Sequence, residues 1–374
     1  MPETNSFVAS HQESLTIAGQ LLKEQGQICS FRKLRLEFNF PARTSRNTMN
    51  YRDVWILSLG PWQGECAPLP GLSPDWSDEA DYETRLSDCL QKWQELLRRP
   101  FPWEGMEAYW NALTDRFPSI AFGIESLLQQ IKGERPEALD WAQGRQGIRM
   151  NGLIWMNDVN TMLAEAHKKV DDGFTCLKFK VGALDWEAEL DLLKEIRQHY
   201  SVQQLEIRVD ANGAFGPDLA PKRLEALQKL GIHSIEQPLP LAMEGHYHDL
   251  CALNLLPVAL DESLLVRRPG PEALAWLSHC GASMLVLKPG LLGGFAVCRA
   301  WIAVAESLNM QWWITSALES NLGLSSVADW TYSLIAKHPK PLAQGLGTGS
   351  LYRNNLPSSL EVRGEYLFRR SSPE

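Results

Sequence analysis

The chain has 374 residues, of which 44% are hydrophobic and 22% are charged. A chain of this length exceeds the usual size of one hydrophobic core, so we expect two domains or one large barrel with an accessory domain; the composition fits neither a disordered nor a membrane protein. The formal net charge of −9 and the pI of about 5.5 disfavour binding to nucleic acids or anionic membranes, which requires a basic face, so small molecules are the expected partners.

The cysteines and the N-terminal residues indicate the compartment. The chain has seven cysteines, an odd number, and no CxxC pair. This pattern predicts neither a disulfide framework nor a zinc knuckle, and it favours a reducing, cytoplasmic compartment. Residues 1–27 lack the basic start and the apolar run of a signal peptide, and no segment reaches about 18 consecutive apolar residues, so we expect no membrane attachment.

The N-terminal part begins with strand patterns and continues with helical patterns. Polar and apolar side chains alternate over residues 31–40, and a second strand pattern covers residues 51–59. At about 78–98 and 119–132, apolar residues recur at three- and four-residue steps, as they do on one face of a helix. These patterns predict an α+β module of roughly 130 residues.

From about residue 148 the sequence changes to short apolar strand candidates, each followed by a helical stretch. The eight candidates are IRMNGLIW (148–155), CLKFKV (176–181), LEIRVD (205–210), HSIE (233–236), PVALD (257–261), MLVLK (284–288), QWWITS (311–316) and LAQGLG (342–347). Alternating strands and helices are typical of parallel βαβ units, and eight units predict an α/β fold of the (β/α)8-barrel type. A doubly wound open sheet is less favoured because no GxGxxG follows the first strand.

Charged residues fall at the C-terminal ends of these strand candidates at a regular spacing. They are Lys178, Lys180, Asp210, Glu236, Asp261 and Lys288. The steps from Lys180 onward are 30, 26, 25 and 27 residues, which is about one strand-helix unit each. Because successive strands of a barrel are neighbours, we expect these side chains to converge on one mouth of the barrel, where barrel enzymes place their active sites.

The three carboxylates of this set, Asp210, Glu236 and Asp261, predict a metal site. Negative charges from three adjacent strands cannot share a dry pocket without compensation, and a hard cation provides it. Oxygen ligands favour Mg²⁺, or Mn²⁺, over zinc. The alternative is that each acid caps the helix after its strand, but three acids in register favour one divalent cation.

The lysines of the set predict proton transfer. Lys178 and Lys180 point to the same face of their strand, because side chains alternate with a period of two. A desolvated lysine near other cations can act as a base, whereas placement of both lysines on a solvated surface is the alternative. Lys288 is expected to face Lys180 across the mouth. Removal of a proton beside a metal-bound substrate carboxylate is therefore the expected chemistry.

These residues and the motifs around them resemble the enolase superfamily over nearly the whole chain. The second strand has KxK, the third to fifth strands have Asp, Glu and Asp, and the sixth strand contains KP. Within the superfamily, the chain is similar to the o-succinylbenzoate synthase family of the menaquinone pathway. The motifs that carry this similarity are RVDANGAF, HSIEQP, ALDES, LKPGLLGGF, TSALESNLGL and QGLGTG.

The resemblance implies a reaction and roles for the lysines. The reaction is syn dehydration of 2-succinyl-6-hydroxy-2,4-cyclohexadiene-1-carboxylate to o-succinylbenzoate through an enediolate, with Mg²⁺ as the cofactor and a small-molecule carboxylate as the substrate. Lys180 would be the base, Lys288 would stabilise the enediolate, and Lys178 would tune Lys180 electrostatically.

Two other functions stay open at this point. An N-acylamino acid or dipeptide racemase of the same superfamily is an alternative, because opposed lysines also support 1,1-proton transfer. The residues Gly347, Thr348 and Gly349 stand where a dipeptide epimerase usually has an acidic residue, which favours dehydration. A noncatalytic small-molecule-binding barrel is an alternative of another class, because a fold does not determine a function.

The resemblance also implies substrate contacts, some of them in mobile loops. The residues expected to contact the substrate are Ser45, Arg46, Asn212, Ser316, Glu319, Ser320, Gly345 and Gly347. Turn or helix-cap roles are the alternative for the serines and glycines. Loops at 41–47 and 64–73 are expected to cover the mouth. Arg43 and Asn47 occupy places where the family pattern has glycines around Thr-Ser-Arg.

A domain division follows from the same resemblance. We expect an α+β capping domain at residues 1–135 and a barrel at residues 136–350. A C-terminal segment, residues 351–374, is expected to return to the capping domain. Residues 1–30 look like an extension to which the sequence assigns no role.

Overall fold

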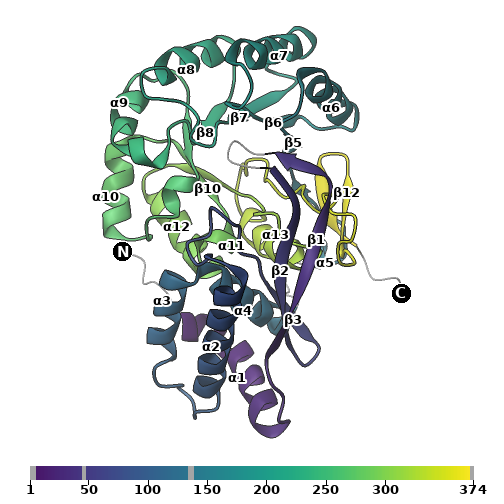
Figure 1. The fold of residues 1–374 in the computed structure, drawn as a ribbon, viewed down its shortest axis with the longest axis vertical. Coiled ribbons are helices and arrows are strands. Elements are labelled where there is room, and N and C mark those ends of the chain that lie inside the picture. Colours follow the sequence, from purple (N-terminus) through teal and green to yellow (C-terminus); the bar gives the residue numbers. More distant parts are fainter. Residues whose placement is uncertain (1–5, 44–47, 134–138, 371–374) are drawn as a thin grey trace.

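The computed structural model describes residues 6–43, 48–133 and 139–370. The N-terminal part, which we call the cap, combines a three-stranded antiparallel sheet of order β1-β2-β3 with helices (Figure 1). Its elements are α1 (Phe7–Glu24), β1 (Ser30–Arg43), β2 (Thr48–Leu59), β3 (Trp62–Cys66), α2 (Glu79–Leu97), α3 (Met106–Arg116) and α4 (Pro118–Lys132). The α+β composition of this part is as the sequence patterns predicted.

The two faces of the cap sheet pack against different parts of the molecule. Along β2, Trp55 and Leu57 belong to a core that they share with the cap helices. Val54 and Ile56 point to the opposite face, because side chains alternate along a strand, and they pack with Tyr352 and other residues beyond the cap. The sheet therefore joins the cap helices to the rest of the chain.

Helix α1 is an integral part of the cap, which gives a structural role to a part of residues 1–30, to which the sequence assigned none. Its residues Phe7, Leu15 and Leu22 are buried in the same core as the helices α2–α4. The Glu107 carboxylate of α3 also accepts the backbone N–H groups of Phe7 and Val8, at 3.0 and 3.1 Å. The periodicity of α1 was not recognised in the sequence, although it has the apolar stripe of a packed helix.

The second part is a parallel sheet of seven strands that alternates with helices. The strands are β5 (Gly152–Ile154), β6 (Cys176–Lys180), β7 (Glu206–Asp210), β8 (Ser234–Glu236), β9 (Val258–Leu260), β10 (Met284–Leu287) and β11 (Gln311–Ile314), in that spatial order. The helical segments are α5 (Leu139–Ala142), α6 (Val159–Asp171), α7 (Trp186–His199), α8 (Ala220–Lys229), η2 (Leu241–His246), α9 (Tyr247–Ala252), η3 (Glu262–Leu264), α10 (Pro271–Cys280), α11 (Pro289–Leu292), α12 (Phe295–Ser307) and α13 (Asn321–Ile335). This is the barrel architecture that the sequence predicted (Figure 1).

The eighth predicted strand is present only as two single bridges. Gln344 pairs with Met150 next to β5, and Gly345 pairs with Thr315 next to β11, so the segment lies between the two edges of the sheet. Its glycine-rich sequence after residue 344 supplies few side chains to pack, which explains the short pairing. The chain then forms a hairpin, β12 (Leu360–Arg363) and β13 (Tyr366–Arg369), in place of an eighth barrel helix.

The first predicted barrel strand is also divided. Its beginning, β4 (Ile148–Arg149), pairs with β13, and only β5 belongs to the barrel sheet. The C-terminal segment contacts the cap before it reaches this hairpin, because Tyr352 pairs with Phe38 of β1. Within the described ranges, no helix combines the length and the apolar character that crossing a membrane requires.

Candidate active site

A pocket opens at the carboxyl ends of the barrel strands. Its polar side comes from the ends of β6, β7, β10 and β11 and from residues 345–348. Its apolar side comes from both parts of the molecule, and we call the residues there the apolar wall: Met49, Leu69, Leu72, Leu291 and Leu318. Leu69 and Leu72 lie in the loop that was expected to cover the mouth. The pocket thus has charged groups on one side and hydrocarbon side chains on the other.

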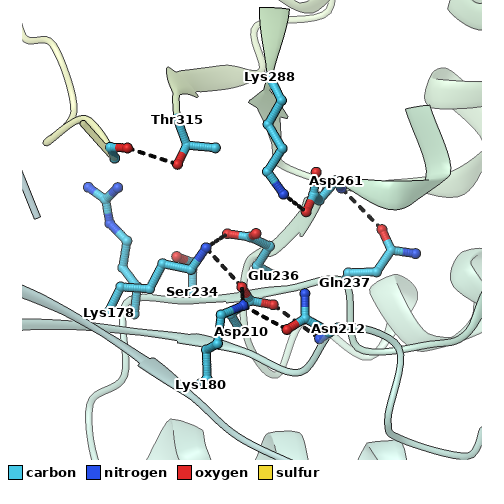
Figure 2. Close-up of polar contacts among 12 residues, drawn as sticks. Lys178, Lys180, Asp210, Asn212, Ser234, Glu236, Gln237, Asp261, Lys288 and Thr315 are labelled. Carbon is cyan, nitrogen blue, oxygen red and sulfur yellow. Dashed lines mark hydrogen bonds and ion pairs between the residues drawn. The ribbon is translucent and has the colours of Figure 1, made fainter. Parts of the chain in front are cut away.

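The six charged residues predicted at the strand ends lie together (Figure 2), and we call them the lysine–carboxylate cluster. Four of them line the pocket: Lys178, Lys180, Asp210 and Lys288. Lys178 Nζ lies 2.9 Å from Asp210 Oδ2 and 2.5 Å from Glu236 Oε2. Lys180 Nζ lies 3.0 Å from the same Asp210 oxygen. Lys288 pairs with Asp261. Each carboxylate therefore has a lysine partner.

The strand register explains how the cluster forms. Lys180 pairs with Asp210 across β6 and β7, and Asp210 pairs with Glu236 across β7 and β8, so the three side chains lie in one row. Phe179, between the two lysines, is fully buried in the main core, as alternation requires. Lys288 follows β10, four strands away from β6 in the sheet order. It consequently approaches the site from the side opposite Lys180 (Figure 2).

The buried charges shift one another's pKa values in opposite directions. Burial acts to raise the pKa of Asp210, but Lys178 and Lys180 outweigh it and hold that pKa well below its usual range. Burial, together with the nearby Asp210 charge, raises the pKa of Glu236 to about 8. Burial acts to lower the pKa of Lys178, but attraction to the two acids outweighs it and raises that pKa. The cluster is therefore a strongly coupled set of charges rather than separate ion pairs.

Two polar residues with positive φ angles support the cluster. Asn212 (φ 44°) accepts a hydrogen bond from Lys180 Nζ at 2.8 Å and donates one to Glu262 Oε1 at 3.1 Å. Gln237 (φ 41°) accepts the backbone N–H of Asp261 at 3.1 Å. Gln237 was missed in the sequence; its place directly after Glu236 in the HSIEQP motif is the signal that could have identified it.

The chemistry of the carboxylates fits a hard divalent cation. Among the residues that the structure describes, no three acidic, histidine or cysteine side chains form a ready metal cage, because lysine ammonium groups lie between the carboxylates. However, Glu236 Oε1 is buried and has no hydrogen-bond partner in the described part of the chain. A buried carboxylate oxygen without a partner is costly unless a cation uses it. The donor set, three carboxylates, is the one that Mg²⁺ or Mn²⁺ prefers.

The predicted substrate contacts divide into two groups. Four of them line the pocket: Asn212, Ser316, Gly345 and Gly347. Glu319 and Ser320 are fully buried and are not among the residues that line the pocket, so their contact with substrate stays a prediction. Ser45 and Arg46 lie outside the described residues.

Hydrogen bonds connect the buried Glu319 to residues that line the pocket. Its Oε2 accepts the Ser316 hydroxyl at 2.5 Å and the Ala317 N–H at 2.8 Å. The Thr348 hydroxyl donates to Ser316 Oγ at 2.8 Å. Glu319 therefore orients the polar groups that do line the pocket.

Comparisons with known proteins agree with this geometry. A family described as "Enolase C-terminal domain-like" matches residues 161–369. The o-succinylbenzoate synthase of Desulfotalea psychrophila is 40% identical over 368 residues, which cover 91% of this chain and 99% of the relative. The crystal structure of MenC from the same organism superposes with a TM-score of 0.76 and 35% identity, over 91% of this chain and 99% of that one.

A more distant neighbour shares only the fold. The dipeptide epimerase of Methylococcus capsulatus, solved in complex with Mg and the dipeptide L-Arg-D-Lys, has a TM-score of 0.73 at 19% identity, over 93% of this chain and 98% of that one. The higher sequence identity and the nearly complete coverage of the D. psychrophila relative decide to which family the chain is assigned. The chain therefore belongs to the o-succinylbenzoate synthase family of the enolase superfamily.

Proposed function

We propose that the pocket dehydrates 2-succinyl-6-hydroxy-2,4-cyclohexadiene-1-carboxylate to o-succinylbenzoate, with Lys180 as the general base. Family membership supports the reaction. The single structural observation that carries the assignment of the base is the position of Lys180, which lines the pocket and is held by Asp210 and Asn212. In this proposal the chain is a lyase of the menaquinone pathway.

The three carboxylates Asp210, Glu236 and Asp261 would hold Mg²⁺ or Mn²⁺. When bound, such an ion supplies positive charge that stabilises the negative charge developing on the substrate carboxylate. Lys178 contacts both Asp210 and Glu236, so it keeps these acids in place and sets the charge around Lys180. The assignment of the ion is supported by the all-oxygen donor set and by the partnerless oxygen of Glu236.

Lys180 would transfer one proton, and Lys288 would stabilise the intermediate. The neutral amine of Lys180 removes the proton from the ring carbon that bears the carboxylate, and the electrons pass into an enediolate. The Lys180 ammonium then returns the proton to the neighbouring hydroxyl, which leaves as water while the ring becomes aromatic. Lys288, on the opposite side, stabilises the enediolate as a fixed cation.

The rest of the pocket would hold the two ends of the substrate. The ring would lie against the apolar wall, where its hydrocarbon face replaces water. The succinyl chain would extend toward Ser316, Gly345 and Gly347, where backbone and hydroxyl groups line the pocket. We further propose a cytoplasmic location, on the basis of seven cysteines that are all free.

One observation favours a second candidate function. Lys180 and Lys288 reach the pocket from opposite strands, and this arrangement also suits racemisation of an N-acylamino acid or a dipeptide. The family assignment favours dehydration over this alternative. It also makes a noncatalytic binding barrel the less supported reading.

Turnover with the pure protein tests the proposal. The protein is incubated with Mg²⁺ and the cyclohexadiene substrate, and formation of o-succinylbenzoate is followed by absorbance. We expect rapid turnover that a chelator abolishes and that excess Mg²⁺ restores. If the substrate stays unchanged while N-acylamino acids racemise, the second candidate replaces the first.

A further inference from the structure

Leu318 combines a strained backbone with a position on the pocket. Its φ of 67° lies in the left-handed region, where a bulky side chain is a genuine outlier. Its side chain belongs to the apolar wall and packs near Met49 and Leu69 of the cap. Such strain persists only where the surrounding structure over-determines the conformation, and it concentrates at functional sites. Neighbouring groups must therefore hold Leu318 in this conformation.

Hydrogen bonds hold the residues on both sides of Leu318. The Arg52 guanidinium donates to the carbonyl oxygens of Ala317 and Ala67. The Tyr352 hydroxyl donates to the carbonyl oxygen of Leu318 itself, at 2.7 Å. The backbone on the N-terminal side of the outlier, and the outlier itself, are thus tied to side chains from outside the barrel strands.

Glu65 holds the residues that follow Leu318. Its carboxylate accepts the N–H groups of Ser320 and Gly323, at 2.8 and 2.9 Å, and it also accepts the Ser320 hydroxyl. These groups form the first turn of α13, where a negative charge is favourable because the helix N-terminus is partially positive. Glu65 thereby fixes the point at which the chain must enter α13.

The three anchoring side chains are almost completely removed from solvent. Arg52 is 2% exposed, Glu65 0% and Tyr352 5%. Arg52 and Glu65 come from the neighbouring cap strands β2 and β3, and Tyr352 comes from the segment that pairs with β1. Burying polar groups is expensive unless they are hydrogen-bonded, and the hydrogen bonds to the 317–323 backbone are the compensation that the structure shows.

We propose that Arg52, Glu65 and Tyr352 are positioning residues that clamp Leu318 in its left-handed conformation, and that Leu318 is thereby a specificity-determining residue of the pocket. The clamp would let the cap set the shape of a surface that belongs to the barrel. The identity of the substrate that meets this surface rests on the proposed function. The conformation of Leu318 and the existence of the clamp do not depend on the proposed function.

A double-mutant cycle tests the clamp. Leu318→Gly removes the side chain and also the strain, because glycine adopts this φ without cost. We expect it to raise KM for the cyclohexadiene substrate about tenfold, as the loss of an apolar contact predicts. Tyr352→Phe removes one hydroxyl and should raise KM about threefold in the parent chain. In the Leu318→Gly background the same change should have an effect of about 1.5-fold or less, because no strain remains to be held.

A matched control separates the clamp from a general loss of packing. Tyr332→Phe removes the hydroxyl of another buried tyrosine, which donates to Gln146 Oε1 at 2.7 Å and lies away from the pocket. We expect no change in KM from it, in either background. Arg52→Lys is a second probe of the clamp, because it keeps a cation but loses the fork that reaches two carbonyl groups. It should follow the same coupling to Leu318→Gly.

The proposal would be overturned if Tyr352→Phe and Arg52→Lys each changed KM as much in the Leu318→Gly background as in the parent chain. A KM change from Tyr332→Phe as large as that from Tyr352→Phe would also overturn it. The free energy of unfolding of the same variants, measured with denaturant, gives a second double-mutant cycle that needs no substrate. There, Leu318→Gly should again suppress the destabilisation that Tyr352→Phe and Arg52→Lys cause. If the parent chain does not turn over the substrate, the proposed function fails, and the unfolding cycle still decides whether the clamp exists.

Discussion

The lysine–carboxylate cluster and the apolar wall meet at the same pocket but are built in different ways. Every member of the cluster comes from a barrel strand or the residue after it, and the register of adjacent strands places it. The wall draws on β2, on the loop after β3, on the short helix α11 and on the loop before α13, and its residue Leu318 has a strained backbone. Local strand geometry therefore positions the reactive groups, whereas contacts between distant segments shape the surface that meets the substrate.

The lysine–carboxylate cluster and the apolar wall are also stabilised by different interactions. In the cluster, opposite charges compensate one another at distances of 2.5 to 3.0 Å, so removing one member changes the charge of the site more than the packing of the fold. The wall and the cap depend on apolar burial and on interlocking hydrogen bonds. Substitutions in the cluster should therefore act on kcat and metal binding, and substitutions in the core of the cap helices should act on stability.

Replacement of the proposed base should have the largest effect. We expect Lys180→Ala to lower kcat by a factor on the order of 10⁴, because general acid–base catalysis is lost. The unfolding midpoint should change little, since Asp210 retains its contact with Lys178. The rate of o-succinylbenzoate formation and denaturant unfolding measure the two quantities. Lys194→Ala, on the exposed face of α7, is the control. A nearly normal rate for the Lys180 variant would remove this residue from the role of base.

Replacement of the central acid should affect metal binding and rate together. Glu236→Gln keeps the size of the side chain but cannot supply a carboxylate to the ion, and we expect activity to fall by a factor on the order of 10³ at fixed Mg²⁺. Part of the loss should be recovered at higher Mg²⁺ concentration. Calorimetric Mg²⁺ titration and activity assays measure the two effects, with the exposed Glu225→Gln of α8 as the control. Unchanged Mg²⁺ affinity would contradict the assignment of Glu236 as a ligand.

The difference in construction also explains what the sequence could predict. Regular spacing located the cluster because one residue at each strand end is enough to define it, and the barrel follows from the same repetition. The wall could not be located, because Met49 and Leu318 are 269 positions apart (49 to 318) and neither lies in a regular pattern. Glu319 was placed on the substrate because its polar motif was visible, whereas its burial depends on Ser316 and Ala317 hydrogen bonds that no pattern encodes.

A cavity in α1 should separate stability from catalysis. Leu15 is fully buried in the core of the cap, and we expect Leu15→Ala to destabilise the protein by about 3 kcal/mol. The kcat and KM of the folded variant should equal those of the parent, because α1 contributes no residue to the pocket lining. Denaturant unfolding and steady-state kinetics measure both, and the exposed Thr16→Ala is the control. A large fall in kcat would show that the cap transmits more to the cluster than the contacts indicate.

A titrating group where the cap meets the barrel should give the smallest effect. Glu125 of α4 is buried and accepts the N–H groups of Phe295 and Ala296 at the start of α12, while His11 Nε2 lies 3.4 Å from its Oε1. Burial raises its pKa from an ordinary value of 4.5 to about 8, although these N–H groups oppose the shift. Between those pH values the unfolded chain releases a proton that the folded chain retains, so this contribution to stability is complete at low pH and falls as the pH rises.

Comparison with Glu125→Gln isolates this contribution, because the amide does not titrate. We expect the difference in unfolding free energy between parent and variant to shift against the parent by about 2 kcal/mol from pH 5 to pH 7. Denaturant unfolding of both proteins across this range gives the difference directly, and titrating groups that do not contact Glu125 cancel in it. A difference that is flat, or that shifts in favour of the parent, would mean that the N–H groups and His11 keep Glu125 ionised. In that case the carboxylate would act as a charged cap of α12.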